Sequence, residues 1–283
     1  MHRAFSQAVD GFRLAYDRGG QGRTVLLLHG WPGDRSDFAE VARRLDAAVL
    51  LPDLRGFGES DKLAGGDYSA AGQARSVLGL LDELGVSAAV LVGCDIGSRI
   101  AQAVARSRPD RVRALVVAPP LPGAGDRVLH PAAQAEFWYQ SFHQLSLAEE
   151  LVDGRAEAVR TYLRHFWTHW SGPGFQLTDA RLDRLTRHYS QPGAFTASIG
   201  WYRAGSGTVR QALAETSPRR RLTMPATALW PEHDPLFPPA WSDRLGEWFA
   251  DLRLEHLAGV GHFSPVEAPD RFAEAISRAL ADS

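Results

Sequence analysis

Residues 88–97 read AAVLVGCDIG, and the fold follows from this stretch. Its first half is a short apolar run typical of a buried strand, and residues 98–107 continue with a helical pattern. Gly93 and Gly97 allow a tight, strained turn that pushes the central side chain out over the end of a sheet. That central residue is Asp95. The strand, turn and helix are the local context of a nucleophile elbow.

Apolar runs bounded by turn residues recur along the chain. They predict buried strands at residues 24–28, 47–51, 88–92, 112–117, 226–230 and 252–256, and edge strands at 1–10 and 12–16. Helical patterns alternate with them at residues 36–45, 69–84, 98–107 and 269–280, and Ser69 is the expected N-cap of the second helix. This alternation predicts an α/β fold with a mostly parallel eight-stranded sheet flanked by helices. The ligand site should lie beyond the carboxyl ends of the strands.

The alternation stops after Val117, at three closely spaced prolines, and resumes near Pro225. The intervening residues are rich in aromatic residues and helix formers, and helices are expected at 134–145, 156–170 and 195–203. We therefore expect a core domain made of residues 1–121 and 218–283, with an inserted helical cap (lid) domain at 122–217.

Composition restricts the class of partner. The chain has 31 basic and 33 acidic side chains and a formal net charge of −2, so no excess of Lys and Arg points to nucleic acid or to an anionic membrane. The longest apolar runs are far shorter than the roughly 18 residues that would span a bilayer, and the N-terminal residues lack the apolar region of a signal peptide. We expect a cytoplasmic protein with a small-molecule substrate; a homodimer stays open.

Two glycine-containing turns follow the first two buried strands. The first is HGWPG at residues 29–33, where the backbone N–H of Trp31 can join that of Ile96 in an oxyanion hole. The second is DLRGFGES at residues 53–60. With the elbow, these turns place polar and flexible residues at three neighbouring strand ends.

On these motifs the sequence resembles the α/β-hydrolase superfamily, over essentially the whole chain outside the inserted segment. The resemblance implies a catalytic triad in which Asp95 is the nucleophile, Asp234 the acid and His262 the histidine. The positions fit this order, because Asp234 follows the strand that ends at Trp230 and His262 follows the last strand.

An aspartate nucleophile narrows the reaction class. A serine that attacked a saturated carbon would form an ether, which has no carbonyl for water to attack, whereas a carboxylate forms an ester. His262, oriented by Asp234, could then activate water against that ester while the oxyanion hole stabilises the developing charge. The substrate must offer an sp³ carbon with a leaving group, as an epoxide or a carbon–halogen bond does.

The leaving group separates these two substrates. Opening an epoxide generates an alkoxide, which needs a proton or a strong hydrogen bond of the kind that tyrosine supplies. The segments FWYQ at 137–140 and GWYR at 200–203 resemble the two cap segments of soluble epoxide hydrolases that hold the epoxide-binding tyrosines. The resemblance implies this role for Tyr139 and Tyr202. The aromatic residues beside them suit a bulky apolar or aromatic epoxide, and we expect the pocket to include Phe137, Trp138 and Trp201.

Dehalogenation is the alternative reaction with the same nucleophile. Haloalkane dehalogenases typically hold the halide with a tryptophan directly after the nucleophile, where this chain has Ile96. Fluoroacetate dehalogenases clamp a carboxylate with two arginines, of which only Arg99 is present. Their acid tends to follow the strand that here ends near Val117, but this chain continues with APP at 118–120 and has no carboxylate until Asp126. Trp138 still resembles their halide-contacting tryptophan, so a haloacid or haloalkane dehalogenase stays open.

Other readings of the chain are less consistent with its motifs. An esterase that has lost its nucleophile or a non-catalytic receptor on the same fold would not need Asp95, Asp234 and His262 together. We expect no metal and no organic cofactor, since His165 and His169 lack the glutamate of a zinc motif.

Cys94 is the only cysteine, so no intramolecular disulfide can form. It stands before Asp95, where histidine is usual in epoxide hydrolases. Strand alternation turns its side chain away from the exposed elbow position, and we therefore expect a buried packing residue and not a thiol nucleophile.

Overall fold

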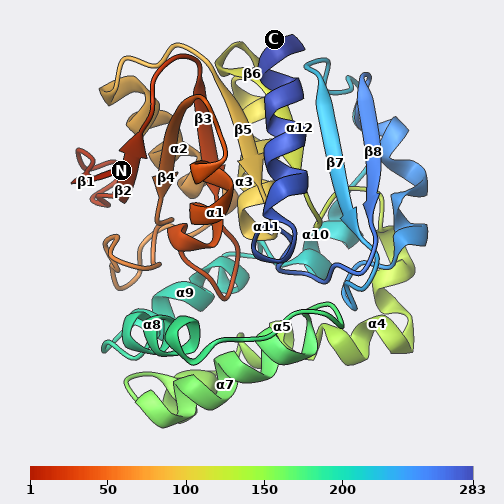
Figure 1. The fold of residues 1–283 in the computed structure, drawn as a ribbon. Helices are drawn as coiled ribbons and strands as arrows, with labels where there is room; N and C mark the ends of the chain where they lie inside the picture. Colours follow the sequence, from red (N-terminus) through yellow and green to blue (C-terminus); the bar gives the residue numbers. More distant parts are fainter. Residues whose placement is uncertain (283) are drawn as a thin grey trace.

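In the computed structural model, which describes residues 1–282, eight strands form one sheet in the order β1-β2-β4-β3-β5-β6-β7-β8 (Figure 1). The first two joints, β1 with β2 and β2 with β4, are antiparallel, and all later pairs are parallel. The strands are β1 (His2–Phe5), β2 (Ala15–Gly19), β3 (Thr24–Leu28), β4 (Ala48–Pro52), β5 (Ala89–Gly93), β6 (Val112–Val117), β7 (Ala226–Pro231) and β8 (Leu252–Leu257). The predicted α/β fold with a mostly parallel sheet is confirmed.

Helices cover both faces of this sheet, since residues along a strand alternate between the faces. Leu26 of β3 belongs to one apolar cluster with residues of α2 and α3, and Leu27 belongs to another with residues of α1 and α12. The helices and 3₁₀ turns outside the segment between β6 and β7 are η1 (Arg35–Phe38), α1 (Ala39–Arg43), α2 (Ala70–Glu83), α3 (Ile96–Ser107), η2 (Pro109–Arg111), η4 (Pro239–Glu247), α11 (Ser264–Glu267) and α12 (Pro269–Asp282). The hydroxyl of Ser69 accepts a hydrogen bond from the Gly72 amide, as expected of the N-cap of α2.

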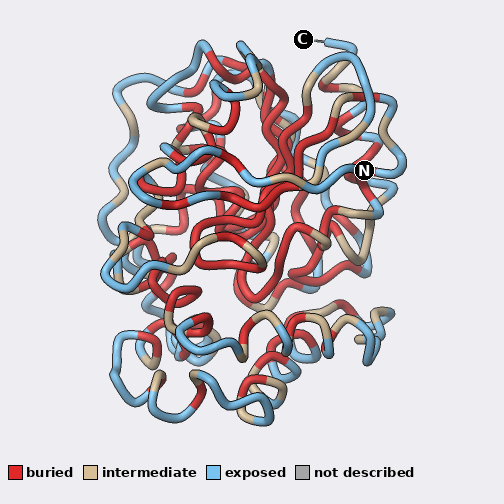
Figure 2. Tube along the Cα trace, turned by 90° about the vertical axis from the view of Figure 1, so that its left-hand side faces the viewer, coloured by how far each residue is buried: buried red, intermediate tan, exposed pale blue. Residues whose placement is uncertain are grey.

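The chain between β6 and β7 forms a separate layer of helices beyond the carboxyl ends of the parallel strands (Figure 1). We call them the inserted helices: η3 (Gly125–Leu129), α4 (Pro131–Glu136), α5 (Trp138–Phe142), α6 (Ser146–Val152), α7 (Ala156–His169), α8 (Asp179–Tyr189), α9 (Ala194–Arg203) and α10 (Thr208–Ala214). Their buried residues continue the apolar cluster of α2 and α3 (Figure 2). The division into a core domain and a cap domain at 122–217 stays a proposal.

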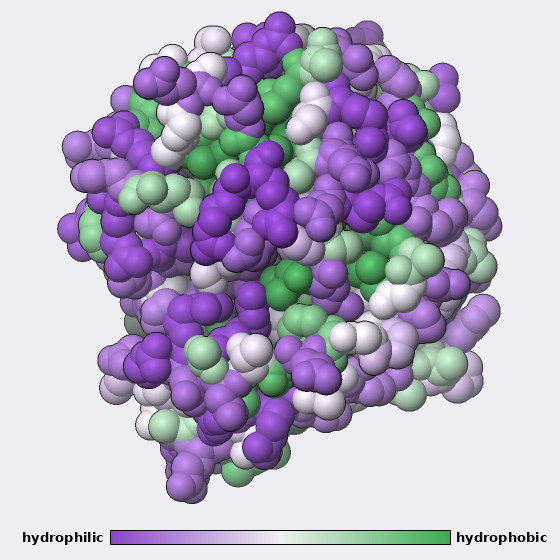
Figure 3. All heavy atoms as spheres, in the orientation of Figure 1, coloured by the Kyte–Doolittle hydropathy of each residue, from purple (hydrophilic) through white to green (hydrophobic). Residues whose placement is uncertain are grey.

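The surface is predominantly hydrophilic on the face drawn in Figure 3, where apolar residues form small separate groups. The central strands are buried (Figure 2), and most of the large apolar residues are buried as well. None of the helices within residues 1–282 combines the length and the apolar character needed to cross a membrane.

Three predicted elements differ from the observed ones. The second edge strand begins at Ala15 and not at residue 12, because a tight turn at Asp10 and Gly11, both with positive φ, pairs Val9 with Phe12 before the strand begins. Residues 134–145 are interrupted at Phe137, which separates α4 from α5. The helix expected at 36–45 is a short 3₁₀ turn followed by the five residues of α1.

Candidate active site

Asp95 lies at the turn between β5 and α3 with φ 49° and ψ −125°, a conformation that non-glycine residues rarely adopt. Glycines at positions 97 and 30 leave room for this turn. A Cβ atom on Gly97 would lie 2.0 Å from the carbonyl oxygen of Leu28, and one on Gly30 would lie 2.4 Å from the Cβ of Asp95. The backbone therefore approaches β3 closely, and the Asp95 side chain is directed over the end of the sheet.

His262 lies between two carboxylates. Its Nδ1 is 2.8 Å from Oδ2 of Asp234, and its Nε2 is 3.4 Å from Oδ2 of Asp95. The Leu236 amide donates to Oδ1 of Asp234 at 2.9 Å, and the His262 amide donates to the Trp170 carbonyl at 2.8 Å. Hydrogen bonds to other residues therefore hold both Asp234 and His262 in position. The structure thus brings together the three residues that the sequence resemblance implies.

The surroundings of His262 favour its charged form. Burial lowers the pKa of the imidazole, but the charges of Asp234 and Asp95 and the hydrogen bond with Asp234 outweigh burial and raise that pKa to about 10. At neutral pH the ring is therefore an imidazolium that bridges two carboxylates.

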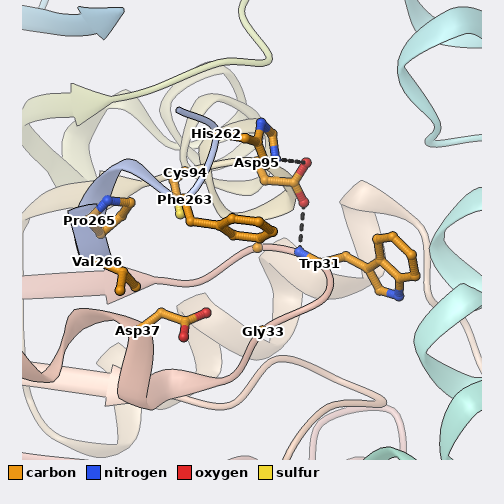
Figure 4. A pocket seen from close by; sticks show the side chains of 10 residues that line it. Trp31, Gly33, Asp37, Cys94, Asp95, His262, Phe263, Pro265 and Val266 are labelled. Atoms are coloured by element: carbon orange, nitrogen blue, oxygen red, sulfur yellow. Dashed lines mark hydrogen bonds and ion pairs between the residues drawn. The ribbon is translucent and has the colours of Figure 1, made fainter. Parts of the chain in front are cut away.

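The two oxygens of Asp95 have different partners. The backbone N–H of Trp31 donates to Oδ1 at 2.7 Å, and Oδ2 faces His262 (Figure 4). Among residues 1–282 no hydrogen bond joins the Ile96 amide to this carboxylate, although Ile96 begins α3 directly after it. A role for Ile96 in an oxyanion hole stays a prediction.

Two small cavities adjoin the Asp95 carboxylate. The first, which we call the tyrosine cavity, has a free volume of about 10 Å³ and is lined by Asp95, Ile96, Arg99, Pro120, Tyr139, Trp201, Tyr202, Ser206 and Thr208. The second, which we call the histidine cavity, has a free volume of about 10 Å³ and is lined by Gly30, Trp31, Gly33, Asp37, Cys94, Asp95, His262, Phe263, Pro265 and Val266 (Figure 4). Asp95 lines both, whereas His262 lines only the second.

Tyr139 of α5 and Tyr202 of α9 meet in the tyrosine cavity, their ring centroids 5.5 Å apart and their planes at 89°. Burial raises the pKa of each phenol well above its ordinary value, and the negative charge of Asp95 adds to the effect. Both phenols are therefore neutral donors over the whole range of physiological pH. The Trp31 indole stacks on the Tyr139 ring at 5.5 Å and 4°, which fixes its plane.

The predicted pocket residues are placed differently from one another. Trp201 lines the tyrosine cavity, but Trp138 lines neither cavity: it is 42% exposed and stacks on Phe166 at the surface. Phe137 is buried against Phe237 and also lines neither cavity. Consecutive residues of a helix point about 100° apart, so a neighbour of Tyr139 need not share its direction, and a place for Trp138 and Phe137 in the substrate pocket stays a prediction.

Other sequence features are structural. In the DLRGFGES turn, Asp53 is fully buried and forms an ion pair with Arg35, and it accepts the amide of Glu59 at 2.8 Å. Cys94 is buried as expected, and burial raises the pKa of its thiol, which keeps it neutral. His169 binds Glu136 at 2.7 Å; within residues 1–282 no group of three potential metal ligands is present.

Sequence reasoning overlooked Asp37 and the side chain of Trp31. Asp37 follows a turn of polar residues that reads as a solvated loop, yet it is buried and lines the histidine cavity. The Trp31 indole contacts Tyr139 and Tyr202, and only the backbone of Trp31 had been considered. The one sequence signal for Trp31 is its position directly after His29 and Gly30 in the first glycine-containing turn.

The sequence pattern of the alpha/beta hydrolase fold family matches residues 23–269. The chain belongs to this family. As an α/β hydrolase it is a hydrolytic enzyme. It is 30% identical over 275 residues to a soluble epoxide hydrolase of Corynebacterium sp. (strain C12), and the alignment covers 92% of this chain and 91% of the relative. A fluoroacetate dehalogenase of Burkholderia sp. is 28% identical over 94% of this chain and 89% of its own length. A solved epoxide hydrolase structure from metagenomes of hot environments superimposes with a TM-score of 0.85 at 25% identity, over 100% of this chain and 99% of the other.

Proposed function

We propose that this α/β hydrolase is an epoxide hydrolase that forms a covalent ester with Asp95 and releases a vicinal diol. The observation that carries the proposal is the meeting of two neutral tyrosines, from two different inserted helices, in a cavity that Asp95 also lines. Its similarity to epoxide hydrolases over almost the full chain supports the same reaction.

The first step follows from the partners of the Asp95 oxygens. Oδ1 is already bound by the Trp31 amide, so it remains as the ester carbonyl. Oδ2 attacks the epoxide carbon, and the C–O bond of the ring breaks with its electron pair moving to oxygen. Tyr139 and Tyr202 donate hydrogen bonds to that developing alkoxide.

The charge on His262 explains how one residue serves both steps. In the free enzyme two carboxylates hold the ring protonated, but esterification removes the charge of Asp95 and so lowers the pKa of His262. The proton passes to the alkoxide, which becomes the first hydroxyl of the product. His262 is then neutral and can accept a proton from water, whose oxygen attacks the Asp95 ester.

The lining of the tyrosine cavity bears on the substrate, because Ser206, Thr208 and Arg99 contribute polar surface beside Trp201. Its free space of about 10 Å³ is room for about one water molecule and therefore does not define the size of the substrate. The bulky apolar or aromatic epoxide expected from the sequence stays a prediction.

Dehalogenation with the same nucleophile is supported by the fluoroacetate dehalogenase relative and by Arg99, which lines the tyrosine cavity. Two observations weigh against it. The Arg99 guanidinium is paired with Glu215 at 2.6 Å, which neutralises the charge a substrate carboxylate would need, and Trp138 lies outside the cavity.

A panel of small epoxides and haloacids, assayed in parallel for diol and for halide release, tests the proposal. We expect diol from at least one epoxide and no halide. Halide release without turnover of any epoxide would replace the proposal with dehalogenation.

A further inference from the structure

The carboxylate of Glu267, in α11, binds the backbone on both sides of His262, and the mechanism above does not use it. α11 lies at the end of the sheet that faces the inserted helices (Figure 1). Oε2 of Glu267 accepts a hydrogen bond from the Gly261 amide at 2.8 Å, and Oε1 accepts one from the Phe263 amide at 3.1 Å. One side chain therefore holds both the residue before and the residue after His262.

The same carboxylate also binds the inserted segment. Its Oε2 accepts a second hydrogen bond, at 2.8 Å, from the amide of Gly172, which lies in the loop between α7 and α8. The two loops approach so closely that neither glycine has room for a side chain. A Cβ atom on Gly172 would lie 2.4 Å from the Gly259 carbonyl oxygen, and one on Gly261 would lie 2.2 Å from the Gly172 nitrogen. Oε2 thus joins the inserted segment to the loop of His262 where the two backbones are in contact.

The direction of the His262 ring depends on this backbone. Nδ1 is hydrogen-bonded to Asp234, but within residues 1–282 Nε2 has no hydrogen-bond partner. A single hydrogen bond to the ring does not fix the direction of Nε2, which also depends on where the backbone places the side chain. Glycines at positions 259 and 261 leave the preceding backbone less restrained than other residues would. The loop therefore needs contacts from other residues to hold it.

We propose that Glu267 is a positioning residue that holds the His262 backbone so that Nε2 stays directed at the Asp95 ester while the ester is hydrolysed; this inference rests on the proposed function. Glu267 lines neither the tyrosine cavity nor the histidine cavity, so it acts through His262 and not on the reacting atoms. A carboxylate suits three N–H donors because both of its oxygens accept hydrogen bonds. In either orientation, the amide of a glutamine would turn its NH₂ toward at least one of these donors.

The alternative is that Glu267 only stabilises the fold, as a cap of α11 and a link to the inserted segment. Glu267→Gln separates the two roles. In single-turnover experiments with a good epoxide, rapid quenching and mass spectrometry of the intact protein give the rates at which the ester adduct forms and decays. In the free protein, the low-field NMR resonance of the proton between Nδ1 of His262 and Asp234 reports the position of the ring. Thermal melting checks that each variant is folded at the assay temperature.

For Glu267→Gln we expect adduct formation within about twofold of wild type, because formation does not need His262 as a base. We expect adduct decay to be slowed at least about tenfold, because the base that activates water is displaced, and the Nδ1 proton resonance to shift or broaden. A loss of folded protein alone would not single out the decay step.

Glu232→Gln is the matched control. Oε2 of Glu232 accepts the amide of Gly259 at 3.0 Å in the same loop, but this side chain is exposed and binds neither neighbour of His262. We expect wild-type rates and an unshifted resonance. Glu267→Asp keeps the charge but draws the carboxylate back by one methylene group, so decay should again be slowed more than formation. This second variant decides the matter if Glu267→Gln does not fold.

Decay of the Glu267→Gln adduct at the wild-type rate would overturn the inference. So would an unchanged Nδ1 resonance, or a slowing of formation and decay by the same factor. Failure of the proposed function looks different, since then no adduct forms in wild type or in a His262→Gln variant, whereas the resonance of the free protein still responds to Glu267→Gln.

Discussion

Among single residues, the site depends on how the Asp95 carboxylate is placed relative to four neighbours: Trp31, His262, Tyr139 and Tyr202. Asp95 gives Oδ1 to the Trp31 amide and presents Oδ2 to His262, and its strained backbone holds both oxygens in place. The tyrosines approach from α5 and α9, so the groups that we propose attack the epoxide and those that we propose stabilise its oxygen belong to different layers of the molecule.

The tyrosines give the prediction at this scale. Tyr139→Phe and Tyr202→Phe should each slow adduct formation by about 10²-fold to 10⁴-fold, because each removes a donor to the alkoxide, and decay of a preformed adduct should be little affected. Tyr162→Phe is the matched control: this tyrosine binds His143 and stacks in the same aromatic cluster but lines neither cavity. If both single variants form the adduct as fast as wild type does, the tyrosines do not act on the epoxide oxygen.

Which site residues could be predicted depends on how local their signal is. Asp95 and His262 lie in turns that come after strands, so the alternation of strands and helices predicts that they lie beyond the carboxyl ends of the sheet, and the resemblance to α/β hydrolases implies their pairing. The burial of Asp37 could not be predicted, because it depends on contacts with Arg181, 144 positions away, and on a cavity that local sequence does not describe. Trp138 is exposed while its neighbour Tyr139 is buried, because consecutive residues of a helix point in different directions, and adjacency in sequence does not reveal this.

At the scale of elements, α8 joins the inserted helices to the turn that carries the Trp31 amide. Arg184 and His188 contact the buried Asp34 carboxylate at 3.3 and 3.1 Å, and the Tyr189 hydroxyl donates to the Gly33 carbonyl at 3.0 Å. Burial alone would raise the pKa of Asp34, but the hydrogen bond with His188 and the charge of Arg184 hold it below its usual value.

We therefore expect Arg184→Met to destabilise the protein by about 1–3 kcal/mol, because it leaves a buried carboxylate without one of its partners. Arg187→Met, at an exposed position of the same helix, should change the free energy of unfolding by less than about 0.5 kcal/mol. Thermal and urea unfolding of the two variants measure the difference. Equal stabilities would show that α8 is not held to the core by this contact.

For the whole molecule, the sheet and its helices could be predicted because buried parallel strands have the sequence pattern of short apolar runs between turn residues. The inserted helices were less predictable: α6, α8 and α10 had not been delimited, and the segment 134–145 is divided at Phe137. The ends of these helices are determined by how the helices pack onto one another and onto the ends of the strands, and a single sequence does not reveal this packing.

The central claim is that Asp95 itself bonds to the substrate, and the fate of one oxygen atom tests it most directly. A single turnover in ¹⁸O-water with enzyme in excess, followed by mass spectrometry of the diol and of the Asp95 peptide, should find the label in Asp95 and a largely unlabelled diol. His262→Gln should accumulate an adduct of substrate mass on that peptide. The exposed neighbour variant His233→Gln should not. Label found directly in the diol, with no adduct in His262→Gln, would mean that water attacks the epoxide and that Asp95 is a base and not a nucleophile.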